Sequence, residues 1–208
     1  MTKPNIATAN GLTRGQESAI LIKLTEQMDL SNIQEAGEFF LRSNVKITVA
    51  KQTIDLGKSP RLPFDGAEVV THEGTGVVDI ELRSDDNLYL DGKKVELFLS
   101  EKQTGDSVVV GNELRKELEG GKKVLLNSNV LDYIYDHPEL YPEHWKKDEN
   151  GYTRYNIFFW GSIFRKKGDL CACYLYWDDG ALNRNEHWLK NDWRRKDSSA
   201  SVSSSAKN

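Results

Sequence analysis

The two cysteines of the chain and one histidine could do thiol chemistry. Cys171 and Cys173 are the only cysteines among the 208 residues, and His187 follows in a neighbouring predicted strand. Two thiolates and one imidazole are one ligand short of the four that structural zinc favours. A Cys–His nucleophile needs a positive, partly exposed environment that lowers the thiol pKa, and no nearby residue marks one. Buried structural thiols are the simpler interpretation, so the sequence predicts no catalytic residue, no metal ligand and no cofactor.

Two acidic pairs, Asp85-Asp86 and Asp178-Asp179, have the composition of a general acid and base. Both pairs lie at predicted turns, where an Asp side chain hydrogen-bonds its own backbone, and turn formation is the favoured interpretation. A small hydrolase-type site that joins Cys173 or Asp178 to His187 stays as the alternative. It requires these groups within about 3 Å of each other in a cleft.

Aromatic side chains are concentrated near the end of the chain. Of the twenty aromatic residues (Phe 7, Tyr 8 and Trp 5), eleven lie between Tyr152 and Trp193, interleaved with Lys and Arg. Rings exposed on a sheet can stack on bases or sugars while basic residues hold phosphates. The competing interpretation places the rings in the core, where each buries about 150–250 Å². If one face binds a partner, the residues expected to make contacts are Trp160, Phe164, Tyr174, Tyr176 and Arg184.

Three predicted strands must position these rings. Aromatic and β-branched runs are separated by Gly-containing turn sequences and lie at residues 157–164, 170–177 and 182–188. Such runs predict an antiparallel three-stranded meander. Strand alternation places Phe158, Trp160 and Phe164 on one face. Both faces are apolar at the centre, so the sheet is either covered on both sides or presents one face as a binding platform.

The rest of the chain predicts an α+β fold: N-terminal helices, an antiparallel β middle, short helices and then the aromatic meander. Helices are expected near 14–28 and 32–42, where apolar residues recur at helical spacing behind capping signals. Short β runs follow between 45 and 99, and short helices are expected to begin near Gly111 and Asn127.

Composition shifts divide the chain into four segments. The expected segments are a flexible N-terminus at 1–11, an α+β lobe at 12–100, a helical connector plus the aromatic meander at 101–193, and a disordered Ser-rich tail at 194–208. The two middle segments could also form one domain. The tail is expected to be disordered because a Ser-rich composition buries too little apolar surface to order itself.

Three short motifs occur together in the second half of the chain. They are Asn127-Ser128-Asn129-Val130-Leu131-Asp132, Pro138-Glu139-Leu140-Tyr141-Pro142-Glu143-His144-Trp145-Lys146 and Phe158-Phe159-Trp160-Gly161. In this order they resemble a group of uncharacterised small bacterial proteins, frequent in candidate-phylum bacteria, with an N-x-N-V-L-D / P-E-x-x-P-E-x-W-K / F-F-W-G pattern. The matching block runs from about Lys93 to Trp193. The resemblance implies a bacterial cytosolic origin and a shared architecture, and it transfers no functional residue.

Charge and hydropathy restrict the classes of partner. The net charge is −4, so no global field attracts nucleic acid and only local patches could do so. The C-x-C spacing does not favour a disulfide and fits a reducing compartment, and no segment has the roughly 18 apolar residues of a membrane span. We therefore expect a cytoplasmic, non-catalytic binding or interaction module with no membrane partner. A protein partner is favoured, with a single-stranded nucleic acid as the alternative.

Overall fold

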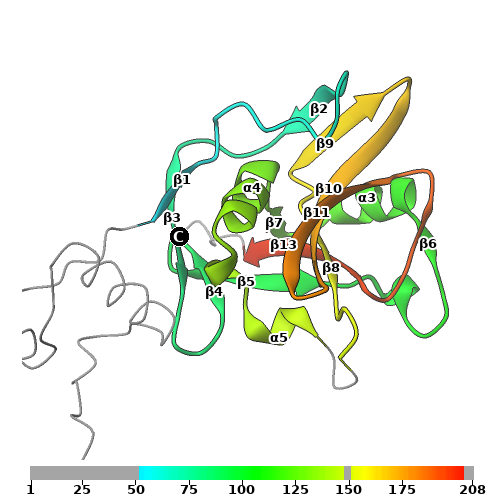
Figure 1. Cartoon of the computed structure of the whole chain (residues 1–208). Coiled ribbons are helices and arrows are strands. Elements are labelled where there is room, and N and C mark those ends of the chain that lie inside the picture. Colours follow the sequence, from blue (N-terminus) through cyan, green and yellow to red (C-terminus); the bar gives the residue numbers. More distant parts are fainter. Residues whose placement is uncertain (1–51, 148–150, 204–208) are drawn as a thin grey trace, which may run out of the picture. The chain divides into compact units, whose positions relative to one another are not determined.

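The computed structural model describes residues 52–147 and 151–203, which belong to one compact unit of the chain (Figure 1). This unit is α+β and consists mainly of strands, as the sequence predicts. The helices expected near 14–28 and 32–42 and the β run near 45 lie outside the described residues. Within the described part, no helix is both long and apolar enough to cross a membrane.

The elements follow one another along the chain with short connections. In order they are β1 (Thr53–Asp55), β2 (Glu68–His72), β3 (Val77–Leu82), β4 (Leu88–Leu90), β5 (Lys93–Phe98), η1 (Glu101–Gln103), β6 (Val109–Val110), α3 (Gly111–Glu119), β7 (Lys123–Leu125), α4 (Ser128–Asp136), η2 (Pro138–Leu140), α5 (Glu143–Lys146), β8 (Asn156–Phe158), β9 (Ser162–Lys166), β10 (Asp169–Asp178), β11 (Ala181–Trp188), β12 (Asp192–Trp193) and β13 (Asp197–Ser203).

One large sheet contains most of the strands. Its order is β1-β3-β4-β5-β13-β8-β10-β9-β2, with β11 beside β10 and β7 beside β13, and β6 pairs separately with β12. The predicted β4–β5 hairpin is confirmed, because Asp91 and Gly92 both have the positive φ that a tight two-residue turn requires. The strand β5 belongs to the predicted lobe at 12–100, yet it pairs with β13. The described residues of the two expected middle segments therefore share one sheet.

The Ser-rich end of the chain forms a central strand of this sheet. β13 pairs with β5 on one side and with β8 and β7 on the other, and its residues 197–202 are all buried. The prediction of a disordered tail from Arg194 is therefore wrong over β13. Hydrogen bonds from both sides satisfy the backbone of this strand, and small side chains suit a position between two packed cores. The apolar surface that orders it belongs to its neighbours.

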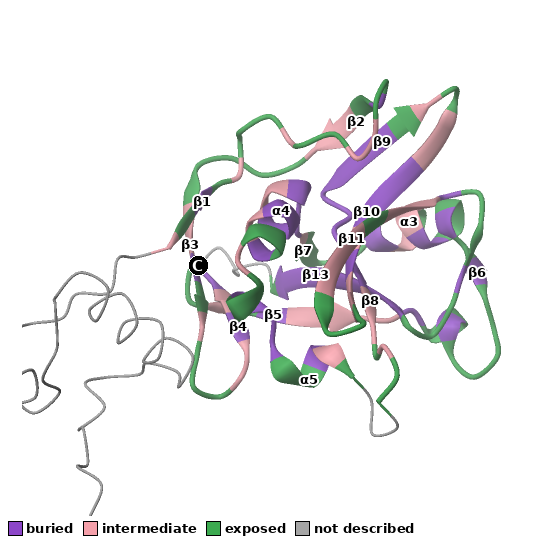
Figure 2. Ribbon diagram, viewed as in Figure 1, coloured by how far each residue is buried: buried purple, intermediate pink, exposed green. Residues whose placement is uncertain are grey.

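Two hydrophobic clusters lie on opposite faces of the sheet. The first joins α4, η2 and α5 to strands from β1 to β13 and includes Phe159, Phe164 and both cysteines. The second joins α3 to Phe158, Trp160 and Trp193. In Figure 2 the buried residues run along β8, β9, β10 and β13, with α4 and α3 on either side. The aromatic sheet is thus covered on both faces at its centre.

A buried charge in β13 should unfold the unit if this strand is central. Ala200→Asp places a carboxylate at a position that is 0% exposed, and we expect it to lower the free energy of unfolding by about 3 kcal/mol or more. Ser203→Asp, at the exposed end of the same strand, should change it by less than about 0.5 kcal/mol. Urea denaturation measures both variants. Equal, negligible effects would show that the segment is disordered.

Candidate functional site

The predicted meander is present, but its first arm is interrupted. β8 and β9 both pair antiparallel with β10, and β11 pairs with β10 on the other side. Phe158 lies opposite Tyr174, and Phe164 lies opposite Cys171. An advance of six residues along the first arm therefore corresponds to an advance of only three residues along β10. This bulge changes which face each later side chain occupies. Phe164 therefore packs on the face opposite Trp160, and its predicted place beside Trp160 is wrong.

A close contact between the backbone at Gly161 and the segment before α4 fixes the position of the bulge. The N–H of Gly161 donates to the carbonyl of Leu126 at 2.9 Å, just before α4 begins. A Cβ on Gly161 would lie 2.9 Å from the carbonyl oxygen of Leu125, so only glycine allows the two segments to approach this closely. The N-cap of α4, Asn127, accepts from the N–H groups of Asn129 and Val130 and fixes the helix start.

Two of the five expected contact residues belong to the core. Trp160 is 3% exposed and Phe164 is 0% exposed, so neither can reach a partner in this fold. Both rings sit where the sheet is covered on both faces, which is the alternative that the sequence left open.

The third expected contact, Arg184, is held by the fold. It lies on the face opposite Tyr174 and forms an ion pair with Asp132 of α4, with Nε and Oδ1 2.9 Å apart and both side chains largely buried. Its Nη2 also donates to the carbonyl of Arg61. Burial raises the pKa of Asp132, while Arg184 and Arg61 act in the opposite direction. Arg184 therefore joins β11 to α4 and is not free for a ligand.

Tyr174 and Tyr176 are half-exposed on one face of the aromatic sheet, and Trp177 and Trp188 are half-exposed on the other. The two tyrosines occupy alternate positions of β10, with ring centroids 5.5 Å apart, and Tyr174 also packs on Phe158 at 4.6 Å. The pairing of β10 with β11 places three polar residues of β11 on the same face. We call the resulting surface the tyrosine face: Tyr174, Tyr176, Asn183, Asn185 and His187.

Trp193 determines where the tyrosine face begins. Its indole packs on Phe158 at 4.1 Å and on Trp160 at 4.6 Å between centroids, and it is fully buried. His187 also meets this indole edge-on at 5.1 Å between centroids, and its Nε2 lies 3.2 Å from the carbonyl oxygen of Asp192. The inner rings are thus covered, and the half-exposed surface begins at Tyr174.

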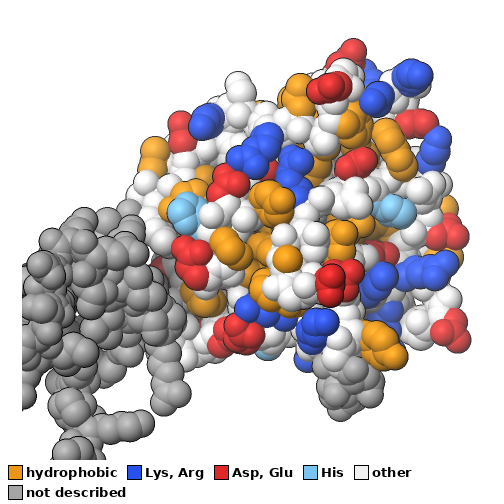
Figure 3. Space-filling view, in the orientation of Figure 1, with side chains coloured by type: hydrophobic (Ala, Val, Ile, Leu, Met, Phe, Trp, Pro, Cys, Tyr) orange, Lys and Arg blue, Asp and Glu red, His pale blue; other side chains and the backbone are white. Residues whose placement is uncertain are grey.

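An exposed cationic turn lies beside the tyrosine face: Arg194, Arg195 and Lys196. Asp197 holds this turn, because its carboxylate accepts from the Arg194 N–H and from Asn156 Nδ2, both at 2.7 Å. Gln103 also donates to the carbonyls of Arg194 and Asp197. None of the three cations forms an ion pair with another described residue. Lys and Arg side chains gather over the segment between β12 and β13 in Figure 3.

The described residues do not assemble the alternative hydrolase site. His187 pairs with Ala172, so its side chain lies on the face opposite the buried Cys173. Asp178 lies at the far end of the same hairpin, six residues along β10 from Ala172. Burial raises the pKa of both cysteine thiols to about 12, which disfavours a thiolate. Among the described residues, no group of three or more His, Cys, Asp and Glu could hold a metal ion.

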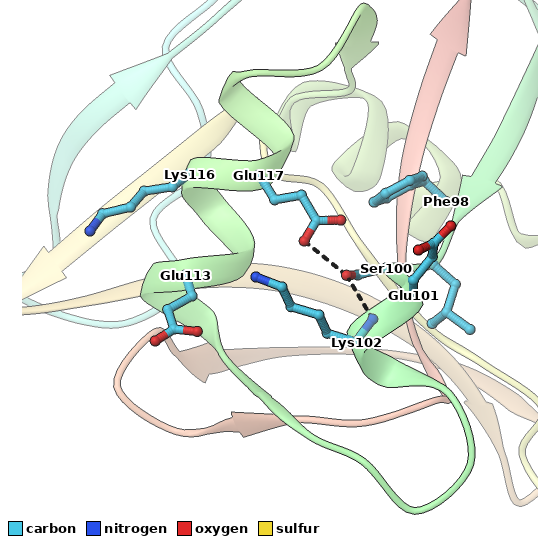
Figure 4. A pocket seen from close by; sticks show the side chains of 8 residues that line it. Phe98, Ser100, Glu101, Lys102, Glu113, Lys116 and Glu117 are labelled. Carbon is cyan, nitrogen blue, oxygen red and sulfur yellow. Dashed lines mark hydrogen bonds between the residues drawn. The ribbon is translucent and has the colours of Figure 1, made fainter.

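A hollow of about 720 Å³ lies between η1, the end of β5 and α3 (Figure 4). Glu and Lys side chains line it, with Ser100 at its base. The hydroxyl of Ser100 donates to Glu117 and accepts from the N–H of Lys102, as the dashed lines show. Ser100 also forms a capping box with Gln103 at the start of η1. Its hydroxyl therefore serves the fold, and the hollow offers no activated nucleophile.

The polar residues of the tyrosine face, Asn183, Asn185 and His187, are not among the contacts that the sequence predicts. A signal for them exists, because a tight turn at Asp179-Gly180 sets Asp178 opposite Ala181 and fixes the register of the whole hairpin. That register places Asn183 beside Tyr176 and Asn185 beside Tyr174.

Comparisons with known proteins leave the function to be argued from this geometry. No protein-family model matches the chain, and neither a curated protein nor a solved structure is significantly similar to it. The surface chemistry of the described residues is therefore the basis for a functional proposal.

Trp160 and Tyr176 should respond differently to truncation. Trp160→Ala removes a fully packed ring, and we expect it to lower the free energy of unfolding by about 3–5 kcal/mol. Tyr176→Ala removes a half-exposed ring and should cost less than about 1 kcal/mol. Chemical denaturation followed by circular dichroism compares the two. A Trp160→Ala protein as stable as the parent would contradict the described core.

The burial of Asp132 beside Arg184 should make stability depend on pH. A carboxylate whose folded pKa is raised stabilises the fold while protonated and loses this contribution as pH rises through that pKa. Arg184→Met leaves an ionised Asp132 without its partner, so we expect a loss of about 3–5 kcal/mol at pH 7. The loss should be smaller near pH 4.5 and smaller again in the double variant with Asp132→Asn. Urea titrations that give the same loss at both pH values would refute this.

Proposed function

We propose that this protein is a non-catalytic binding module whose contact surface is the tyrosine face. The observation that carries the proposal is the pair of half-exposed rings, Tyr174 and Tyr176, on one face of β10. Phe158, Trp160 and Trp193 belong to the same cluster and are buried, so these two rings are the accessible end of a row of packed aromatic side chains. Aromatic side chains with an apolar body and a polar tip are enriched at binding surfaces.

The support beneath the two rings favours binding over simple exposure. Tyr174 packs on Phe158, which in turn packs on Trp193, so three ring contacts lead from the core to the surface at Tyr176. Side chains held in this way lose little conformational entropy when a ligand binds. The tyrosine hydroxyls form no hydrogen bond with other described residues, so both can meet a ligand.

Amide groups border the rings and add polar contacts. The Asn185 Oδ1 accepts from the N–H of Glu186, which fixes the side chain while leaving its NH₂ available. Asn183 instead donates to the carbonyls of Ala181 and Asp178, so its Oδ1 is available as an acceptor. One face thus offers two stacking surfaces, a donor and an acceptor, which is the composition of a recognition site.

A cytoplasmic location and a bacterial origin are part of the proposal. The free thiols of Cys171 and Cys173 are fully buried, which suits a reducing compartment. The resemblance of the 93–193 block to small bacterial proteins supports the same origin.

The proposal is tested by binding to three defined classes of probe. Immobilised full-length protein is exposed to a single-stranded oligonucleotide, to a mixture of soluble oligosaccharides and to a phage-displayed random peptide library. We expect one class to bind and to be lost in Tyr176→Ala at unchanged thermal stability, because that substitution removes half of the stacking surface. Tyr135→Ala, which removes a 38% exposed tyrosine on α4, should leave binding intact.

No binding of any class, or binding that Tyr176→Ala leaves unchanged, would overturn the proposal.

A further inference from the structure

We infer that the ligand of the tyrosine face is a single-stranded nucleic acid, an inference that rests on the proposed function. The adjacent rings of Tyr174 and Tyr176 and the unpaired cationic turn that precedes β13 together point to this ligand. Bases have flat π-faces that can stack on the rings, and phosphates carry the negative charge that can pair with the cations of the turn.

The strand register places rings and cations in one row across the sheet. Asp197 of β13 pairs with Asn156 of β8, Asn156 pairs with Tyr176 of β10, and Tyr176 pairs with Asn183 of β11. Lys196 comes immediately before this row, and its carbonyl accepts from the N–H of Asn156 at 2.8 Å. Neighbouring strands are about 4.8 Å apart, so the backbone of the turn lies roughly 10 Å from that of Tyr176. A base on Tyr176 can therefore be linked to a phosphate beside the turn.

The charge of the turn is not used by the fold. Asp197 is the nearest carboxylate in the sequence, and its two oxygens bind backbone and amide N–H groups instead of the side chains of Arg194, Arg195 and Lys196. Exposed carboxylates do lie near the face, at Asp178, the last residue of β10, and at Asp192, the first residue of β12. Among the described residues, the two strand positions that join Tyr176 to Lys196 are Asn156 and the buried Asp197, so neither presents an exposed carboxylate.

These features distinguish a single strand from other ligands. A neutral sugar would use the rings and amides but would gain little from three free cations. A duplex hides the faces of its bases, so it could reach the turn but could not stack on Tyr174 and Tyr176. The amides of Asn183 and Asn185 can hydrogen-bond base edges, which in a single strand are exposed. Stacking is tolerant of base identity, so we expect only a modest sequence preference.

The inference is tested with fluorescently labelled oligo(dT) and oligo(U) and the full-length protein, by fluorescence anisotropy. We expect affinity to fall as salt rises, and Tyr176→Ala to weaken binding about fivefold or more, because one stacked base is lost. Tyr135→Ala is the matched aromatic control and should bind like the parent.

The contribution of the turn is tested by Arg195→Ala. If Arg195 holds a phosphate, the slope of log affinity against log salt should decrease by about one. Lys58→Ala is the matched charge control, because Lys58 is exposed on a loop whose backbone is bound to Asn129 of α4. This control should leave the slope unchanged.

Three results would overturn the inference: no oligonucleotide binding at low salt, equal competition by a duplex of the same length, or binding that Tyr176→Ala does not weaken. If oligonucleotides fail while a peptide or sugar binds and is lost in Tyr176→Ala, the ligand class is wrong and the tyrosine face still stands. If Tyr176→Ala affects no probe, the proposed function fails as well.

Discussion

The packing of Trp193 over Phe158 and Trp160 decides how much of the aromatic sheet a partner can reach. This contact depends on Gly111, because a Cβ there would lie 2.3 Å from the indole Nε1 and 2.8 Å from the backbone of Leu189. Hydrogen bonds from the first two N–H groups of α3 to the carbonyls of residues 191 and 189 hold the indole's segment against the helix. The inner rings become core, and the same face continues outward as Tyr174 and Tyr176. The surface proposed to bind a ligand is therefore the part of this aromatic row that Trp193 does not cover.

The opposite face depends on the start of α4. The side chain of Ser162 accepts from the N–H of Ser128 and lies 2.7 Å from His72 Nδ1, while His72 Nε2 lies 3.0 Å from the carbonyl oxygen of Leu56. Together with the Gly161 contact to residues 125–127, this network joins β2, β9 and α4. The three short motifs in the second half of the chain supply the α4 cap, the buried Trp145 and this glycine. We interpret the pattern as a requirement of packing, which explains why it marks no reactive group.

The sequence predicted the local structure well where turns and alternation define it. The β4–β5 hairpin, α3, α4 and the β10–β11 arms follow from turn residues, caps and apolar spacing within each segment. It failed where a distant segment decides the outcome. The Ser-rich β13 is ordered by strands β5, β7 and β8, which composition does not reveal, and the bulge before β9 is fixed by the backbone of residues 125–127. The sequence likewise predicts that Arg184 is a surface cation, because its ion-pair partner Asp132 is distant from it in the chain. Of the five expected contacts, the two tyrosines of β10 remain available.

Hydroxyl-radical footprinting of the native protein, read by peptide mass spectrometry, tests most directly whether Tyr174 and Tyr176 are accessible while the rings packed behind them are covered. We expect rapid oxidation of Tyr174 and Tyr176, with Trp160, Trp193 and Tyr141 protected until the protein is unfolded, since the last three are at most 3% exposed. Protection of Tyr174 and Tyr176 to the same degree as Trp193 would show that the face is covered in the whole chain and would contradict the central claim.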